Sequence, residues 1–90
     1  MAKIKILCFE SKGWEDYLYW QKQDKKTLEK INILIEEILR NPFVGIGKPE
    51  ALKADFAGLW SRRISDEHRL VYAVREDRII IAQCRYHYSR

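Results

Sequence analysis

The 90-residue sequence is poor in the residues that build linkers, disulfide frameworks and metal sites. It has two prolines, four glycines and two cysteines, with no serine-rich or glutamine-rich tract. So little proline and glycine leaves no room for a long linker or a disordered tail, and we expect one ordered domain over residues 1–90. Cys8 and Cys84 lack the C-x-x-C spacing of a metal site, which predicts two reduced thiols and no bound metal.

Long apolar runs are missing as well. No stretch approaches the roughly 20 apolar residues that cross a bilayer, and residues 3–6 alternate lysine with isoleucine where a signal peptide would be continuously apolar. These absences predict a cytoplasmic protein without a membrane partner.

The motifs of several enzyme classes are also absent. The sequence contains no G-x-G-x-x-G, Walker loop, H-E-x-x-H or G-x-S-x-G motif, so nucleotide-dependent, zinc-dependent and serine-nucleophile chemistry lose support. We therefore expect no cofactor, and acid–base catalysis by single side chains is the chemistry that remains.

Hydrophobic periodicity in the first half predicts a strand followed by two helices. Residues 3–9 suit a strand that ends near Glu10. Ser11 is the expected cap of a first helix with an aromatic stripe that begins at Trp14, and Asp24 either stops this helix or caps the next. Asn41-Pro42 ends the second helix, and the tight joint predicts an antiparallel hairpin. The second helix has the clearer apolar stripe: Leu28, Ile31, Leu34, Ile35, Ile38 and Leu39.

The second half predicts a long loop and an antiparallel meander. Residues 42–58 lack periodicity and hold both prolines, and three strand-like runs follow at about 59–65, 68–75 and 79–86. The whole is an α+β fold with one sheet. Residues 79–82 are apolar at every position, so both faces of this strand would be apolar, which predicts a central strand covered on both faces. The helices can cover only one face, so a homodimer would supply the second cover.

Basic residues are in excess, with 17 Lys and Arg against 13 Asp and Glu. The acidic pairs fall in the predicted turns, whereas four arginines fall within the predicted strands: Arg62, Arg63, Arg69 and Arg85. This segregation predicts a basic sheet face beside the loop that carries Lys48 and Lys53. Such a face is either a solvated polar surface or a surface that binds phosphate groups.

Three side chains have the chemistry that RNA cleavage needs. Glu50 can accept the proton of a 2′-hydroxyl, Arg69 can stabilise charge on the five-coordinate phosphorus, and His87 can protonate the departing 5′-oxygen. Each also has an ordinary explanation: a solvated loop carboxylate, a surface ion pair and a terminal aromatic resting on the sheet.

Strand register decides whether these side chains share a face. A two-residue turn at Glu76-Asp77 would place Arg69 and His87 on opposite faces. Because that acidic pair is not a favoured two-residue turn, we expect a three-residue connection through Arg78, which sets Arg69 opposite Arg85 and on the His87 face.

Four ordered motifs resemble those of one known family. They are residues 45–53 (GIGKPEALK), 58–64 (GLWSRRI), 67–72 (EHRLVY) and 85–88 (RYHY). Together with the helical segment 14–20 (WEDYLYW), they closely resemble the Txe/YoeB toxins of bacterial type II toxin-antitoxin systems, which are RelE-like mRNA interferases. The resemblance covers the chain from about Lys3 to Tyr88.

The resemblance implies a RelE-like, microbial-ribonuclease-like fold and a ribosome-dependent endoribonuclease that cuts mRNA in the decoding site. It implies a cognate antitoxin as inhibitor and contact with operator DNA through the antitoxin complex. The matching catalytic set is Glu50 as base, Arg69 as phosphate stabiliser and His87 as acid. The residues matched to RNA or phosphate binding are Lys53, Arg63 and Tyr88. His68 also fits the pattern, but a histidine at a hairpin turn is more often structural and stays outside the catalytic set.

A non-catalytic basic module that binds nucleic acid or an acidic peptide is the alternative. Glu50 discriminates between the two, because a phosphate-binding surface gains nothing from a carboxylate beside arginines, whereas chemistry on a 2′-hydroxyl requires a base.

Overall fold

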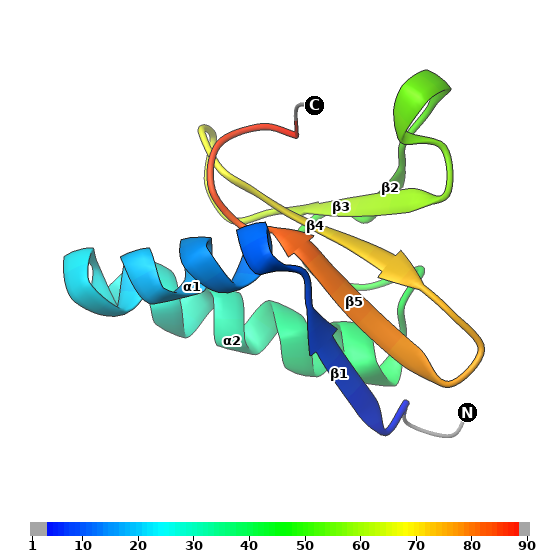
Figure 1. The fold of residues 1–90 in the computed structure, drawn as a ribbon, viewed down its shortest axis with the longest axis horizontal. Coiled ribbons are helices and arrows are strands. Elements are labelled where there is room, and N and C mark those ends of the chain that lie inside the picture. The colour runs from blue at the N-terminus through cyan, green and yellow to red at the C-terminus, as the bar shows by residue number, and fades with distance from the viewer. Residues whose placement is uncertain (1–3, 89–90) are drawn as a thin grey trace.

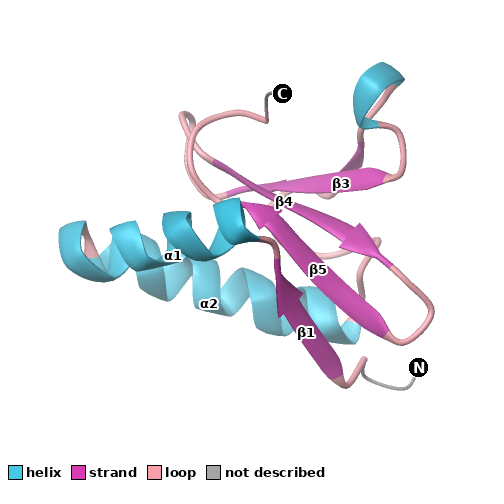
Figure 2. Cartoon of the chain, viewed as in Figure 1, coloured by secondary structure: helices cyan, strands magenta, loops and turns pink. Residues whose placement is uncertain are grey.

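Two helices cover one face of a five-stranded sheet in the computed structural model, which describes residues 4–88 (Figures 1 and 2). The elements are, in order, β1 (Ile6–Phe9), α1 (Ser11–Gln23), α2 (Lys25–Arg40), β2 (Glu50–Ala51), the short 3-10 helix η1 (Ala54–Phe56), β3 (Leu59–Arg63), β4 (Arg69–Val74) and β5 (Arg78–Gln83). The predicted α+β fold is confirmed, while β2 and η1 lie in the segment predicted to be a loop. No helix within residues 4–88 is long and apolar enough to cross a membrane.

The strand order is β1-β5-β4-β3-β2. β1 runs parallel to β5, and the other neighbours are antiparallel, so the N-terminal strand makes the sheet mixed. β5 lies inside the sheet, as predicted for residues 79–82. Its two faces differ, however: Ile79 and Ile81 are fully buried, whereas Ile80 and Ala82 are only half-buried. The expected cover on both faces is therefore complete on the helix side alone.

Asp24 joins the two helices and serves both. Its N–H donates to the Trp20 carbonyl at the end of α1, and its carboxylate accepts from the backbone N–H groups of Lys26 and Thr27 at the start of α2. The Thr27 hydroxyl and N–H hold the pKa of this carboxyl below its usual value. Ser11 was expected to cap α1, but it is the first helical residue, and Glu10 precedes it without a side-chain capping bond.

α1 lies directly on β5 because a glycine faces the strand. A Cβ placed on Gly13 would lie 2.5 Å from the carbonyl oxygen of Ile81, closer than real contacts allow. Asp16 and Trp20 follow on the same buried face, while Trp14 is 47% exposed. The aromatic stripe predicted from Trp14 onward is thus turned away from β5 and packs against Phe9 of the edge strand β1.

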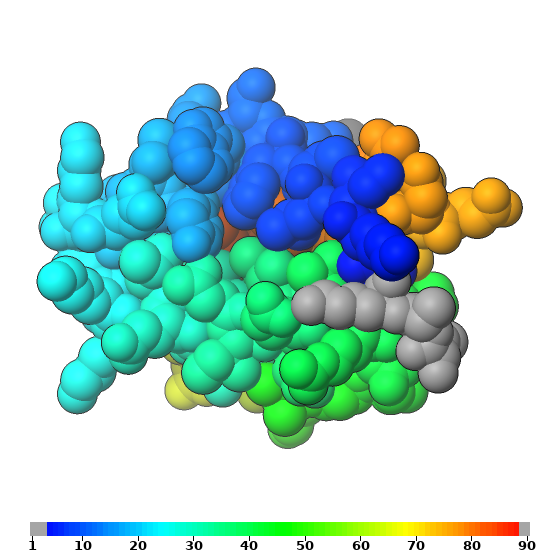
Figure 3. Space-filling view, turned by 90° about the horizontal axis from the view of Figure 1, so that it is seen from below, coloured from blue at the N-terminus to red at the C-terminus, as the bar shows by residue number. Residues whose placement is uncertain are grey.

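The core lies between the helices and the sheet. Figure 3 shows this side of the molecule, where the atoms of α1, α2 and β1 hide most of the sheet. Four residues of the predicted α2 stripe are buried in it, which confirms that stripe. The cluster of buried residues is Trp20, Ile31, Leu34, Ile35, Ile38, Ile64, Leu70, Tyr72, Ile79, Ile81 and Cys84.

The β4–β5 hairpin corrects the predicted register. Arg75 N–H donates to the Arg78 carbonyl, so the acidic pair forms a two-residue turn and the three-residue connection is wrong. The one-residue shift arises further along, where Tyr72 pairs with Ile81 but Val71 pairs with Gln83. This β-bulge moves the Gln83 side chain to the face opposite the helices and places Cys84 in the core.

Arg62 fastens the loop between α2 and β2. The side chain is completely buried. It donates to the carbonyl oxygens of Asn41, Val44 and Ile46 and, through Nε, to the Tyr72 hydroxyl at 3.1 Å. Burial raises the pKa of Tyr72. Arg62 was expected on the basic sheet face, but strand alternation turns it towards the helices, where it holds the loop that leads to Glu50.

Candidate active site

Strand alternation gathers the site residues on the face that the helices leave open. Ser61 and Arg63 flank Arg62 on β3 and point to the opposite side from it. Arg63 pairs with Arg69 of β4, and Ser61 pairs with Glu50 of β2. Three strands therefore bring these four residues together, although they are up to 19 positions apart in the chain.

These residues line a cleft of about 350 Å³ on the open face. Its lining consists of Lys48, Pro49, Glu50, Ser61, Arg63 and Arg69. Within residues 4–88, no ion pair joins the Glu50 carboxylate to the cations around it. The carboxylate thus shares a polar cleft with basic groups while remaining available to a ligand.

The cross-strand pair of Arg63 and Arg69 is electrostatically unfavourable by itself. Like charges directly opposite each other on one face of a sheet repel. The Arg69 guanidinium is nevertheless fixed, because its Nη1 donates to the carbonyl oxygens of Ser65 at 2.6 Å, Asp66 at 3.2 Å and His68 at 3.1 Å. A fixed Arg69 guanidinium beside the exposed Arg63 forms a site suited to an anion such as phosphate.

His87 lies next to the cleft, outside its lining. Its Nε2 is 3.4 Å from the Asp66 carbonyl oxygen, which also accepts from Arg69 Nη1. The imidazole and the guanidinium thus meet at one turn of the chain. Gln83, which the sequence analysis did not single out, donates from Nε2 to the His87 carbonyl at 2.9 Å. The bulge that aims Gln83 there leaves no signal in the sequence pattern.

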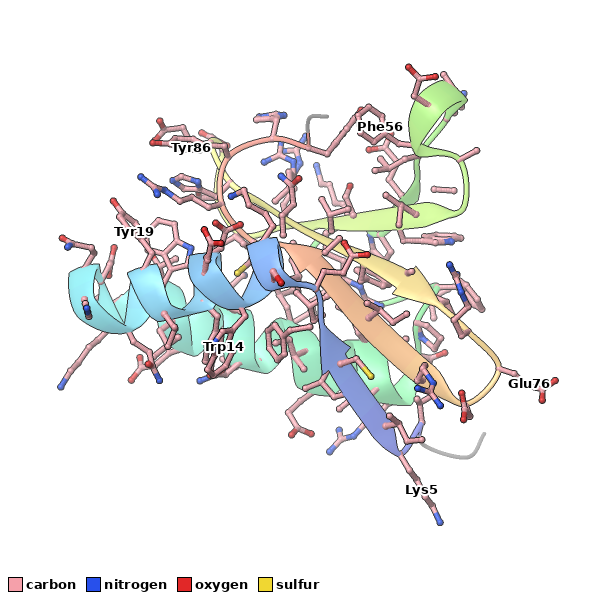
Figure 4. The ribbon with its side chains drawn as sticks, in the orientation of Figure 1. Lys5, Trp14, Tyr19, Phe56, Glu76 and Tyr86 are labelled. Carbon is pink, nitrogen blue, oxygen red and sulfur yellow. The ribbon has the colours of Figure 1, made fainter. Side chains whose placement is uncertain are left out.

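Lys53 and Tyr88 lie apart from the cleft. Lys53 is exposed just before η1. The Tyr88 ring meets Phe56 edge-to-face at 4.9 Å, and both line a second cavity of about 340 Å³ over β3, β4 and β5. In Figure 4, Phe56 points towards the C-terminal segment across this open face. The face therefore has a charged part at Arg63 and Arg69 and an apolar, aromatic part at Phe56 and Tyr88.

Arg85 does not join the basic sheet face that the sequence predicted. Its guanidinium stacks 3.6 Å from the centre of the Tyr19 ring on α1 and 4.8 Å from the Tyr86 ring. Figure 4 shows Tyr19 and Tyr86 side by side at that end of the molecule. Lys48 and Ser61 take part in the cleft instead, and the alternation of β3 was the signal that could have identified Ser61.

Comparisons with known proteins cover both the cleft and the C-terminal segment. A sequence model of the YoeB-like toxins of bacterial type II toxin-antitoxin systems matches residues 9–88. Toxin YoeB of Escherichia coli K12 is 57% identical over 82 residues, which are 91% of this chain and 98% of that protein. A YoeB dimer from Staphylococcus aureus matches with a TM-score of 0.87 and 50% identity, over 94% of this chain and 99% of the other. A YoeB-YefM toxin-antitoxin heterotetramer from the same organism matches with a TM-score of 0.85 and 50% identity, over 97% and 100%.

Proposed function

Because this chain belongs to the YoeB-like toxins of bacterial type II toxin-antitoxin systems, we propose that it is an endoribonuclease that cuts messenger RNA on the ribosome. The observation that carries the proposal is the cleft in which Glu50 lies with the cross-strand pair of Arg63 and Arg69. The cleft offers positive charge for a phosphate and a carboxylate for a proton on the same face.

The proposed reaction is attack by the 2′-oxygen of a nucleotide on its own 3′-phosphate. Glu50 removes the 2′-hydroxyl proton while the oxygen–phosphorus bond forms. Arg69 stabilises the charge that develops on the phosphorus oxygens. The bond from phosphorus to the 5′-oxygen of the next nucleotide breaks, and His87 supplies the proton that this oxygen takes up. The products are a 2′,3′-cyclic phosphate and a 5′-hydroxyl end.

The rest of the open face fits RNA binding. Arg63 lies beside the scissile phosphate in this arrangement, Lys53 is placed to contact the backbone beyond it, and Tyr88 offers an aromatic face for a base. We expect poor cleavage of free RNA and efficient cleavage of ribosome-bound mRNA, because a single acid is available and the open face suits docking on RNA. Equal rates on both substrates would contradict the ribosome requirement.

A cognate antitoxin is the proposed inhibitor. The S. aureus relative is found with YefM in a heterotetramer, and the positive open face here suits an acidic segment that folds over the cleft and the C-terminal segment. Contact with operator DNA would then come through the antitoxin complex. A homodimer like that of the S. aureus relative is the other proposed assembly, and the cytoplasm, where the ribosomes are, is the proposed location.

The test is single-turnover cleavage at saturating ribosome concentration in a cell-free translation reaction, with mapping of mRNA 3′ ends. We expect a rate loss of about 100 to 10,000-fold for His87→Gln and about 100 to 1,000-fold for Arg69→Ala. Arg75→Ala is the matched control, because this exposed arginine directly follows β4, at the opposite end of the strand from Arg69. Wild-type rates for both His87→Gln and Arg69→Ala would favour the non-catalytic binding module over the enzyme.

A second arm tests the nucleophile. A 2′-deoxy nucleotide at the scissile position should abolish cleavage, since the attacking oxygen is then missing. Continued cleavage at that position would exclude the proposed reaction while leaving the family assignment intact.

A further inference from the structure

The C-terminal segment, residues 84–88, has no regular secondary structure, yet side chains from α1, β5 and the turn between β3 and β4 hold its backbone. The chain enters this segment from β5 at Cys84. The Cys84 N–H donates to Asp16 Oδ2 at 3.0 Å, and the Cys84 carbonyl accepts from Trp20 Nε1 at 2.8 Å. Gln83 Nε2 donates to the His87 carbonyl. Backbone polar groups away from water need such partners, so this segment is fixed by side chains where a strand would use a ladder.

Tyr86 is the strained residue of the segment. Its φ of 61° lies in the left-handed region, which a bulky aromatic residue rarely adopts. Its peptide groups are held on both sides: the Tyr86 N–H donates to His68 Nδ1 at 2.7 Å, and its carbonyl accepts from the Arg69 N–H at 3.0 Å. Backbone strain of this kind persists only where the surroundings impose it. The residue that follows is His87.

The His68 side chain is built into this position. It is 14% exposed, and its ring packs edge-on against Trp20 at 4.8 Å between centres and lies tilted against the Tyr86 ring at 5.3 Å. Because Nδ1 accepts the Tyr86 N–H, the ring proton resides on Nε2, which lies 4.0 Å from a Glu67 carboxylate oxygen. The imidazole therefore supports the backbone through Nδ1 and is turned towards Trp20 and Tyr86.

We propose that His68 is a positioning residue that sets the orientation of His87 through the Tyr86 peptide. By holding the Tyr86 N–H, His68 imposes the left-handed turn, and this turn brings the His87 imidazole to the Asp66 carbonyl beside Arg69. His68 itself does not touch the substrate. This inference rests on the proposed function, since it assigns His68 a task in the chemistry of His87.

Two substitutions separate the acceptor of His68 from its ring. In His68→Asn, the side-chain Oδ1 lies where Nδ1 lies in histidine, so the acceptor for Tyr86 is retained and the ring is lost. In His68→Phe, the ring against Trp20 is retained and the acceptor is lost. We expect His68→Asn to keep most of the single-turnover rate. We expect His68→Phe to lose about 100-fold, the effect of displacing a catalytic group by about 1 Å, at an unchanged half-saturating ribosome concentration.

Amide hydrogen exchange of Tyr86, measured by NMR on the free protein, gives a readout that does not depend on cleavage. Exchange should be slow in the wild type and in His68→Asn and fast in His68→Phe. Thermal melting should show that all three proteins are folded. A His68→Phe variant with wild-type cleavage and slow Tyr86 exchange would overturn the inference.

Equal inactivity of His68→Asn and His68→Phe would also overturn it, because the ring and not the acceptor would then be required. The failure of the proposed function looks different. In that case the wild type itself does not cleave ribosome-bound mRNA, while the Tyr86 exchange rates still report whether His68 holds the C-terminal segment.

Discussion

Arg62 and Arg63 are neighbours in the chain with opposite surroundings, and replacing each by methionine should separate stability from activity. Both substitutions remove one positive charge and leave a side chain of similar length. Arg62 is fully buried, whereas Arg63 is exposed in the cleft. Any difference between the two variants therefore comes from the face of β3 on which the arginine lies.

The loss expected for Arg62→Met follows from its acceptors. The guanidinium donates to three backbone carbonyls and to the buried Tyr72 hydroxyl. The carbonyls of Val44 and Ile46 belong to exposed loop residues and can take water instead. The Asn41 carbonyl also belongs to an exposed residue, so the contact that water replaces poorly is the one to the buried Tyr72 hydroxyl. A hydrogen bond from a charged donor contributes about 1.5–3 kcal/mol.

At about 5 °C per kcal/mol for a domain of this size, Arg62→Met should lower Tm by roughly 7–15 °C. Arg63→Met should change stability by no more than about 0.5 kcal/mol, as an exposed substitution does. A small gain is the expected sign, because the repulsion from Arg69 across the strand pair disappears. In the cleavage assay, Arg63→Met should raise the half-saturating ribosome concentration by about tenfold, the loss of one phosphate contact of about 1.4 kcal/mol.

The measurements are thermal and urea unfolding of the two variants, followed by single-turnover cleavage at a temperature where both are folded. Equal losses of Tm in the two variants would refute the assignment of the faces. So would a Tm for Arg63→Met below that of Arg62→Met. An Arg63→Met variant that cleaves like the wild type would remove Arg63 from the RNA-binding surface.

Further predictions follow from the packing of Gly13 and Cys84 and from the cap of α2. Gly13→Ala should lower the free energy of unfolding by about 1–3 kcal/mol in urea titrations, because the new methyl group collides with the Ile81 carbonyl; an unchanged midpoint would contradict the close approach of α1 to β5. Burial raises the pKa of Cys84 to about 12, so at pH 8 a thiol reagent should modify half-buried Cys8 in the native protein and Cys84 only on unfolding. Because of the same shift, the contribution of the Cys84 thiol to stability is complete below the ordinary thiol pKa of 9.0 and is lost as the pH rises towards 12. In urea titrations, the stability of Cys84→Ala should therefore fall less steeply over this pH range than that of the wild type. Asp24→Ala should lower Tm because it removes the cap of α2. The Tm of this variant should also depend less on acid: because folding lowers the pKa of Asp24, the stability that its carboxylate contributes is complete above the usual pKa of the group and is lost as the pH falls below that value.

The sequence predicted the elements that a local pattern specifies. The α2 stripe is buried as expected, since residues three and four apart share one face of a helix whatever lies beyond it. Asp24 was predicted as a boundary because a short acidic side chain can reach the N–H groups of a first helical turn. The basic face was predicted from the separation of arginines from acidic turns, and Arg63 and Arg69 do lie on it.

What the sequence could not supply depends on contacts between distant segments. The parallel pairing of β1 with β5 joins residues about 70 positions apart, and no local pattern encodes it. Strand alternation already sets Arg62 and Arg63 on opposite faces of β3, but which of the two faces the helices cover is known only from the structure. The predicted three-residue turn failed for the same reason: a bulge opposite Val71 makes the required shift, and it is stabilised by the contacts of Gln83 and Cys84.

The unfavourable features of the molecule lie at the cleft and the C-terminal segment. Arg63 and Arg69 repel across two strands, and Tyr86 adopts a left-handed conformation. Neither feature stabilises the free protein, and both persist because the helix side of the sheet supplies a well-packed core. An anion between the arginines would remove the repulsion, and a fixed Tyr86 keeps His87 beside the place where that anion would bind. In the proposed reaction, the stability of the helix-covered face would thus maintain an electrostatically strained arginine pair on the other face, where negative charge develops on phosphorus.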